Sequence, residues 1–130
     1  MKRERILIVD DNAQNLKLSR VLLSRYGYEL RTATDAKEAL SVLETFTPRL
    51  ILLDLQLPGM DGFELARRLK ADPRTSQIVI LAVTAYAMKG DAERAQAAGC
   101  DGYVTKPIDT KTLPGVIANY VMRATPHWLN

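Results

Sequence analysis

The stretch that most constrains this chain is residues 50–62, which read LILLDLQLPGMDG. A short unbroken apolar run, bounded by turn-forming residues, predicts a strand covered on both faces, as the strands of parallel sheets are. The run stops at Asp54, and Pro58, Gly59 and Gly62 then predict a loop. Asp54 is therefore expected at the carboxyl edge of a buried sheet, where open α/β sheets bind their ligands.

The rest of the chain alternates short apolar runs with amphipathic stretches. Further strands are predicted at residues 6–9, 29–33, 78–83 and 102–105. Helices are predicted from the N-cap Asn12 to about 25, from Thr34 or Asp35 through Phe46, at 63–71, at 91–98, and to about 123. Because of Pro114, the last of these should begin irregularly, or effectively near Leu113, where a following proline is tolerated. Strands alternating with helices predict an α/β fold, a doubly wound five-stranded parallel sheet in order 2-1-3-4-5 with five helices.

Two of these helices carry specific expectations. The first is predicted to bury a broad apolar stripe, made of Leu16, Leu18, Val21, Leu22, Leu23 and Tyr26. The helix at 91–98 turns only alanines inward, and it should shift easily because alanines bury little apolar area.

Composition limits the function classes. The chain has 130 residues, 47% hydrophobic and 25% charged, which is the balance of one globular domain. Its single cysteine, Cys100, cannot form an internal disulfide, and no apolar run is long enough for a membrane span or a signal peptide. Lys and Arg are scattered, with few aromatics among them, so we expect a cytoplasmic protein without nucleic-acid or membrane partners.

Acidic residues also follow the strand at 6–9, where Asp10 and Asp11 stand next to each other. In the order 2-1-3-4-5 the first and third strands are neighbours, so these acids should lie beside Asp54. Three carboxylates in one crevice repel each other unless a cation neutralises them. Oxygen ligands with room for water suit Mg²⁺, or Mn²⁺ in its place.

Thr84 and Lys106 end the fourth and fifth predicted strands and should reach the same edge. A cation, a lysine, a hydroxyl and a carboxylate in one crevice indicate a phosphoryl site, with Asp54 as the nucleophile. No Ser, Cys or His in these loops competes for that role.

Four ordered blocks resemble one known family: ILIVDDN, LILLDLQLPGMDG, AVTAYAMKGD and GCDGYVTKPI. Across residues 5–121 the chain resembles a response-regulator receiver domain of two-component signalling, with a flavodoxin-like (CheY-like) fold. It is most similar to single-domain DivK-type regulators and to the receivers of hybrid sensor kinases. We expect a receiver domain at 1–123 and a C-terminal tail at 124–130.

The resemblance implies that Asp54 accepts a phosphoryl group from a phosphohistidine of a histidine kinase or a histidine phosphotransfer protein. It implies Mg²⁺ ligation by Asp11, Asp54 and the backbone carbonyl of Gln56, with Asp10 acting mainly through water. Such a domain catalyses only its own phosphorylation and dephosphorylation and is otherwise no enzyme.

The resemblance also implies a switch. Thr84 and Lys106 would bind the phosphoryl group, the Lys106–Pro107 bond would be cis, and the Tyr103 ring would turn inward as Thr84 moves. The face formed by the fourth helix, fifth strand and fifth helix would contact a downstream protein. The chain itself would be a monomer or a weak dimer. The resemblance further implies that Gln56 and Tyr86 would tune the rate of dephosphorylation.

Other function classes make different demands on the sequence. A phosphatase of the haloacid dehalogenase type would need an aspartate at Gln56 and room for a cap insertion. A dinucleotide-binding domain would need a glycine-rich turn where Asp10 and Asp11 stand. A pseudo-receiver that binds partners without phosphorylation, and a receiver excised from a hybrid histidine kinase, remain open.

Overall fold

The structure is a computed structural model that describes residues 3–84 and 90–123. Its strands are β1 (Arg5–Val9), β2 (Glu29–Ala33), β3 (Leu50–Asp54), β4 (Val79–Thr84) and β5 (Gly102–Thr105). Its helices are α1 (Ala13–Ser24), α2 (Ala36–Val42), α3 (Gly62–Ala71), α4 (Asp91–Ala97) and α5 (Leu113–Arg123). Within the described residues the strands form one parallel sheet in the order β2-β1-β3-β4-β5, as the sequence predicts.

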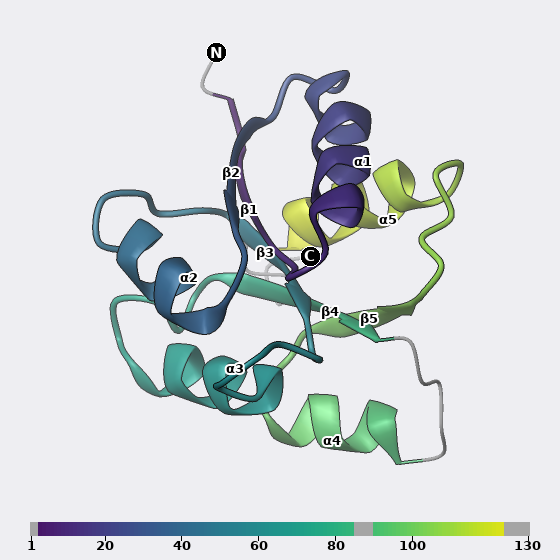
Figure 1. Ribbon diagram of the computed structural model, residues 1–130. Coiled ribbons are helices and arrows are strands. Elements are labelled where there is room, and N and C mark those ends of the chain that lie inside the picture. Colours follow the sequence, from purple (N-terminus) through teal and green to yellow (C-terminus); the bar gives the residue numbers. More distant parts are fainter. Residues whose placement is uncertain (1–2, 85–89, 124–130) are drawn as a thin grey trace.

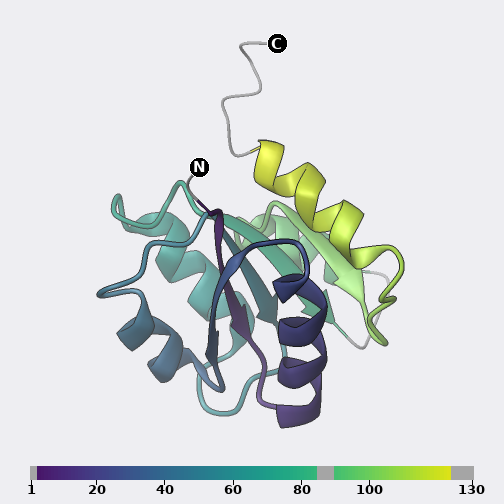
Figure 2. The same ribbon diagram turned by 90° about the horizontal axis from the view of Figure 1, so that it is seen from above.

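Helices cover both faces of this sheet. Helices α1 and α5 lie on one face, and α2, α3 and α4 lie on the other (Figures 1 and 2). Because side chains alternate along a strand, Ile6 and Ile8 belong to the core under α1 and α5, whereas Leu7 and Val9 belong to the core under the other three helices. The central strands are thus buried on both sides, and all five residues of β3 are buried.

Local capping fixes where two helices begin. The side chain of Asn12 accepts a hydrogen bond from the backbone N–H of Asn15 at 3.0 Å, which caps α1 as predicted. Of the two predicted caps for α2, Asp35 is the one that accepts, from Glu38 N–H at 2.7 Å. The side chain of Glu38 in turn accepts from the N–H of Thr34, the residue before the cap, in an arrangement similar to a capping box.

Of the broad apolar stripe predicted for the first helix, Leu16 and Leu23 are buried and Leu22 is partly buried, but the other three residues are exposed. Leu18 is 45% exposed, Val21 46% and Tyr26, beyond the helix end, 58%. The buried face of α1 is a narrow stripe at helical spacing that consists of Leu16, Ser19 and Leu23. The number of apolar residues in the helix does not show which of them are buried, because the angle at which α1 packs on the sheet decides which side chains are covered.

The second helix is shorter than predicted. It ends at Val42, and hydrogen-bonded turns continue the chain to Phe46, which is buried at 5% exposure all the same. The guanidinium of Arg31 lies 5.0 Å from the centroid of the Phe46 ring, and that of Arg5 lies 5.8 Å away. The apolar periodicity therefore predicted the burial of Phe46 correctly, but the helix that it predicted is too long.

The last helix begins at Leu113, as the sequence predicts. Pro114 then falls in the first turn, where its missing N–H would have no partner within the helix. No helix in the described ranges has the length and apolar character that crossing a membrane requires.

Candidate functional site

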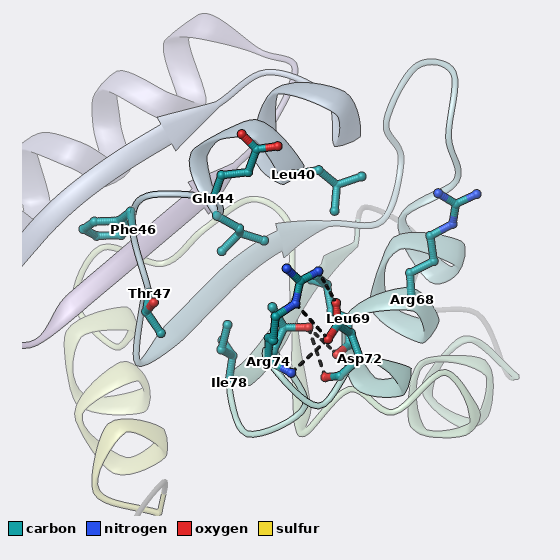
Figure 3. A pocket seen from close by; sticks show the side chains of 11 residues that line it. Leu40, Glu44, Phe46, Thr47, Arg68, Leu69, Asp72, Arg74 and Ile78 are labelled. Atoms are coloured by element: carbon teal, nitrogen blue, oxygen red, sulfur yellow. Dashed lines mark hydrogen bonds and ion pairs between the residues drawn. The ribbon is translucent and has the colours of Figure 1, made fainter.

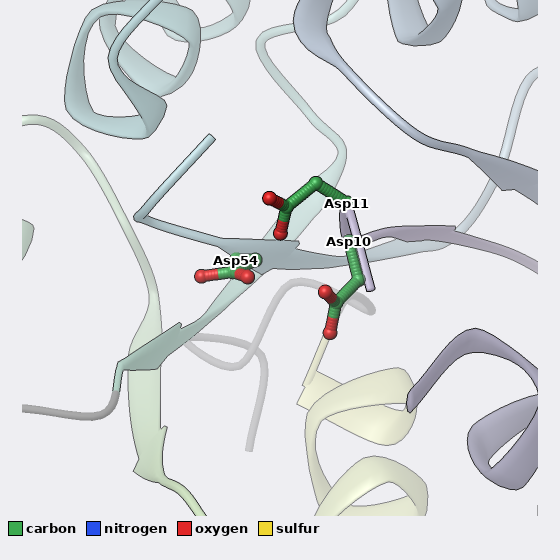
Figure 4. Close-up of side chains that lie close together, drawn as sticks. All are labelled: Asp10, Asp11 and Asp54. Atoms are coloured by element: carbon green, nitrogen blue, oxygen red, sulfur yellow. The ribbon is translucent and has the colours of Figure 1, made fainter. Parts of the chain in front are cut away.

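Three carboxylates meet at the carboxyl edge of the sheet. Strand β1 leads directly into Asp10 and Asp11, β3 ends in Asp54, and the two strands pair with Val9 opposite Leu53. One carboxylate oxygen from each acid lies within 4.8 Å of the others (Figure 4). Asp54 is 1% exposed and Asp10 5%, whereas Asp11 is exposed. The doubly wound topology thus brings together the predicted acids.

Hydrogen bonds fix the orientation of the two buried acids. The Asp10 carboxylate accepts from the N–H of Asn12 at 2.9 Å, and the Asp54 Oδ1 accepts from the N–H of Gln56 at 2.9 Å. Burial raises the pKa of Asp10 above its ordinary value; the negative charge of Asp54 adds to this, and the Asn12 bond and Lys106 oppose it.

Lys106 supplies the positive charge. Its Nζ donates to Oδ2 of Asp54 at 2.8 Å and lies 3.9 Å from Oδ2 of Asp10. The residue comes directly after β5, where its N–H donates to the carbonyl of Thr84 at 2.8 Å. The Lys106–Pro107 peptide bond is cis, as predicted. One ammonium against three carboxylates leaves the cluster net negative.

The other predicted site residues differ in how exposed they are to solvent. Thr84 is 4% exposed at the end of β4, whereas Tyr103 on β5 is 44% exposed. Gln56 is exposed in the loop that follows Asp54. Tyr86 lies outside the described residues. The structure therefore gathers Asp10, Asp11, Asp54 and Lys106 by direct proximity and brings Thr84 to the same edge.

The cluster suits a hard divalent cation. Mg²⁺ takes oxygen ligands and is commonly held by one or two carboxylates, with water and phosphate completing its shell. Here two buried acids and one exposed acid offer oxygens within 4.8 Å of each other. The exposed side of the cluster leaves access for water and for a phosphoryl group, so the donor set fits Mg²⁺.

A cavity of about 400 Å³ lies at the opposite, amino edge of the sheet (Figure 3). Its lining comes from the ends of α2 and α3 and from the loops that lead into β3 and β4. At its mouth the Arg74 guanidinium pairs with the Asp72 carboxylate at 3.0 Å, which holds the pKa of Asp72 below its ordinary value. Its lining mixes apolar side chains, among them Leu40 and Leu69, with charged ones, and it lies at the edge of the sheet opposite the acid cluster.

A second cavity, of about 350 Å³, adjoins the acid cluster. Gln56 and Thr84 line it, and so does Arg94 from α4. Sequence reasoning missed Arg94, because no local pattern separates it from the other exposed arginines of the chain. Its position beside Thr84 depends on how α4 packs against α3.

Comparison with known proteins agrees with this geometry. A family model described as "Response regulator receiver domain" matches residues 6–118. The polar-differentiation response regulator DivK of Brucella anthropi is 41% identical over 116 residues, which cover 89% of this chain and 94% of DivK.

Two solved structures are similar in fold. A CheY-like response regulator receiver domain protein from Methanospirillum hungatei superposes with a TM-score of 0.89 at 30% identity, covering 97% of this chain and 99% of that one. The receiver domain of sensor histidine kinase PA1611 from Pseudomonas aeruginosa, which holds a magnesium ion in its active-site cleft, gives 0.84 at 29% identity, covering 93% and 99%.

Proposed function

The chain belongs to the family of response regulator receiver domains, and from this membership we propose that Asp54 is its phosphoacceptor. Members of this family are signalling phosphoacceptors that interact with histidine kinases or phosphotransfer proteins, and they are not true enzymes. Here the donor is a phosphohistidine on such a partner. Phosphorylation then changes a protein-binding face.

The observation that carries this proposal is the Lys106 ammonium, 2.8 Å from an oxygen of Asp54 inside the acid cluster. A carboxylate oxygen of Asp54 attacks the phosphorus, and the P–N bond of the phosphohistidine breaks with its electron pair returning to the imidazole. Lys106 then pairs with a phosphoryl oxygen, and the Thr84 hydroxyl donates to another.

A magnesium ion, or manganese in its place, fits this proposal. Asp11, Asp54 and the backbone carbonyl of Gln56 would hold it, with Asp10 acting mainly through water. When bound, the ion would neutralise charge on the phosphoryl oxygens. The donor set of three clustered acids supports this assignment, and so does the magnesium in the PA1611 receiver.

The output surface is the face made of α4, β5 and α5. Thr84 moves toward the phosphoryl group, and the ring of Tyr103, 44% exposed, turns into the space that it leaves. Gln56 and Tyr86 tune the rate of dephosphorylation. We assign the receiver domain to residues 1–123 and the tail to 124–130, and a monomer or weak dimer in the cytoplasm stays a prediction.

Labelling with acetyl phosphate and Mg²⁺ tests the proposal. Asp54→Asn should abolish incorporation of phosphate, measured by intact mass, and EDTA should abolish it in the wild type. Asp109→Asn, at an exposed acid that is not part of the three-carboxylate cluster, is the matched control and should label normally. Undiminished labelling of Asp54→Asn would refute the assignment. It would then favour the alternative, a module that binds partners without phosphorylation.

A further inference from the structure

The cavity of about 350 Å³ beside the acid cluster joins two parts of the fold. One wall is the loop after Asp54, including Gln56, and the start of α3; the other is Thr84 and Arg94. The Leu55 N–H donates to the carbonyl of Val83 at 2.9 Å, so the ends of β3 and β4 lie side by side beneath it. The lining therefore includes the residues directly after the phosphoacceptor, and Thr84.

Arg94 is fixed in this wall by an aromatic ring. Its guanidinium carbon lies 4.2 Å from the centroid of the Phe63 ring, close enough for a cation–π interaction. Phe63 is only 7% exposed, and Arg94 itself is exposed on α4. The stacking holds the long, flexible side chain against α3, in the wall of the cavity.

The ring in turn has a fixed position relative to Asp54. A Cβ at Gly62 would lie 2.8 Å from the carbonyl oxygen of Asp54 and 2.6 Å from the Cα of Leu55, so the start of α3 touches the end of β3 directly. Asp61 caps this helix by accepting from the Phe63 N–H at 2.9 Å. Through Phe63, the Arg94 side chain is held against the helix start that touches the end of β3.

The two cations near the site are engaged differently. Lys106 donates to Asp54 itself. Among the side chains that the structure describes, no carboxylate forms an ion pair with Arg94, and the Asp61 carboxylate that shares the cavity caps α3. Arg94 is thus a cation in the cavity wall that packs on an uncharged ring.

We propose that Arg94 is a positioning residue that draws small anionic phosphodonors, such as acyl phosphates, into this cavity beside Asp54; the inference rests on the proposed phosphoacceptor function. In the reaction with acetyl phosphate, an Asp54 oxygen attacks the phosphorus and the bond from phosphorus to the acyl oxygen breaks. Acetate leaves with the electron pair, and no proton has to be supplied. Arg94 contributes by holding the anion near Asp54 before transfer, because opposite charges attract across a partly desolvated cavity.

A series of donors of different charge tests this inference. At neutral pH acetyl phosphate is a dianion, whereas phosphoramidate is a net monoanion. Arg94→Gln should raise the half-saturating concentration about fivefold for acetyl phosphate and about twofold for phosphoramidate, because the Coulomb energy scales with donor charge. The maximal rate constant should stay within about twofold, since no bond being broken touches the guanidinium.

Three controls separate this role from a structural one. Arg94→Lys keeps the charge and should recover most of the acetyl phosphate affinity. Arg74→Gln removes an equal charge at the opposite edge of the sheet and should change neither donor's half-saturating concentration. Added salt should reduce the difference between wild type and Arg94→Gln, because it screens the attraction.

The possible outcomes distinguish the role of Arg94 from the role of Asp54 as phosphoacceptor. Equal effects on both donors, or none, would overturn the role of Arg94 while leaving Asp54 as phosphoacceptor. A wild-type protein that neither donor labels would overturn both. A change confined to the maximal rate constant would mean that Arg94 acts through structure, which also contradicts the proposal.

Discussion

The ammonium of Lys106 lies 2.8 Å from Oδ2 of Asp54, although 52 positions separate the two residues in the chain. The ion pair joins the ends of β5 and β3 across β4. Both side chains are largely buried, the lysine at 19% and the aspartate at 1% exposure. Removing one partner should therefore leave buried charge without its counterion.

Lys106→Met should lower the free energy of unfolding in EDTA by about 1–3 kcal/mol, because Asp10 and Asp54 then repel each other without compensation. Urea denaturation measures this. Lys111→Met, an exposed lysine on the same connection to α5, should change it by less than about 0.5 kcal/mol. Equal effects of the two substitutions would contradict the role given to the Lys106 ion pair.

Mg²⁺ should stabilise the fold, because it binds the native acid cluster and not the unfolded chain. At ten times its dissociation constant the gain is about 1.4 kcal/mol. The melting temperature should rise with MgCl₂ and not with NaCl of equal ionic strength, and Asp11→Ala should lose most of the rise. A full Mg²⁺ response in that variant would argue against Asp11 as a ligand.

Beryllofluoride with Mg²⁺, standing in for the phosphoryl group, should change amide NMR shifts of residues 90–104 well beyond the site. The reason is that α4 buries mainly Ala95 and, at its end, Ala98, and so is weakly anchored. Thr84→Ala should still be phosphorylated at Asp54 but show a smaller distal change. Shifts confined to the loops around Asp10, Asp54 and Lys106 would mean that the signal does not pass through Thr84.

A second ion pair, partly exposed, should matter for stability alone. The Lys70 ammonium donates to Asp101 at 3.0 Å and to the carbonyl of Ile78 at 2.7 Å, and Asp101 also accepts from the N–H of Ile80 at 2.8 Å. Asp101→Ala leaves that fully buried N–H without this partner and should cost about 2 kcal/mol.

Asp101→Asn provides the matched comparison, because its amide oxygen can still accept from Ile80 while the ion pair with Lys70 is lost. It should cost about 1 kcal/mol, half as much as the alanine. Phosphate labelling should be normal in both variants. If asparagine and alanine destabilise the fold equally, the hydrogen bond to Ile80 is not the larger contribution.

Cys100 should react slowly in the folded protein. Burial, with the negative charge of Asp101, raises the pKa of its thiol from 9.0 to about 11, while Lys70 opposes the shift. A pKa raised by that amount lowers the thiolate fraction at pH 8 about a hundredfold, so alkylation should be slower than in urea by a similar factor. The native rate should climb as pH approaches the raised pKa, and equal rates in the two states would contradict the shift.

Much of the site was predictable because its residues end apolar runs. Three apolar runs each predicted a strand: those that end before Asp10, at Asp54 and at Thr84. Parallel strands bring their carboxyl ends to one edge of the sheet. Cap choice was equally local: Asn12 bonds to an amide three residues on, a contact that needs no tertiary partner. The start of α5 at Leu113 followed from the chemistry of the proline after it.

The sequence by itself determined the elements, their order and the residues at the strand ends, because those depend on contacts between residues a few positions apart. Only the tertiary structure decided that Leu18 and Val21 face solvent, that Arg94 stacks on Phe63 at 4.2 Å, and that the Lys106 ammonium bonds to Oδ2 of Asp54. Those outcomes depend on the angles and distances at which the helices pack against the twisted sheet. Packing between elements distant in the chain sets these angles, and no local periodicity encodes them.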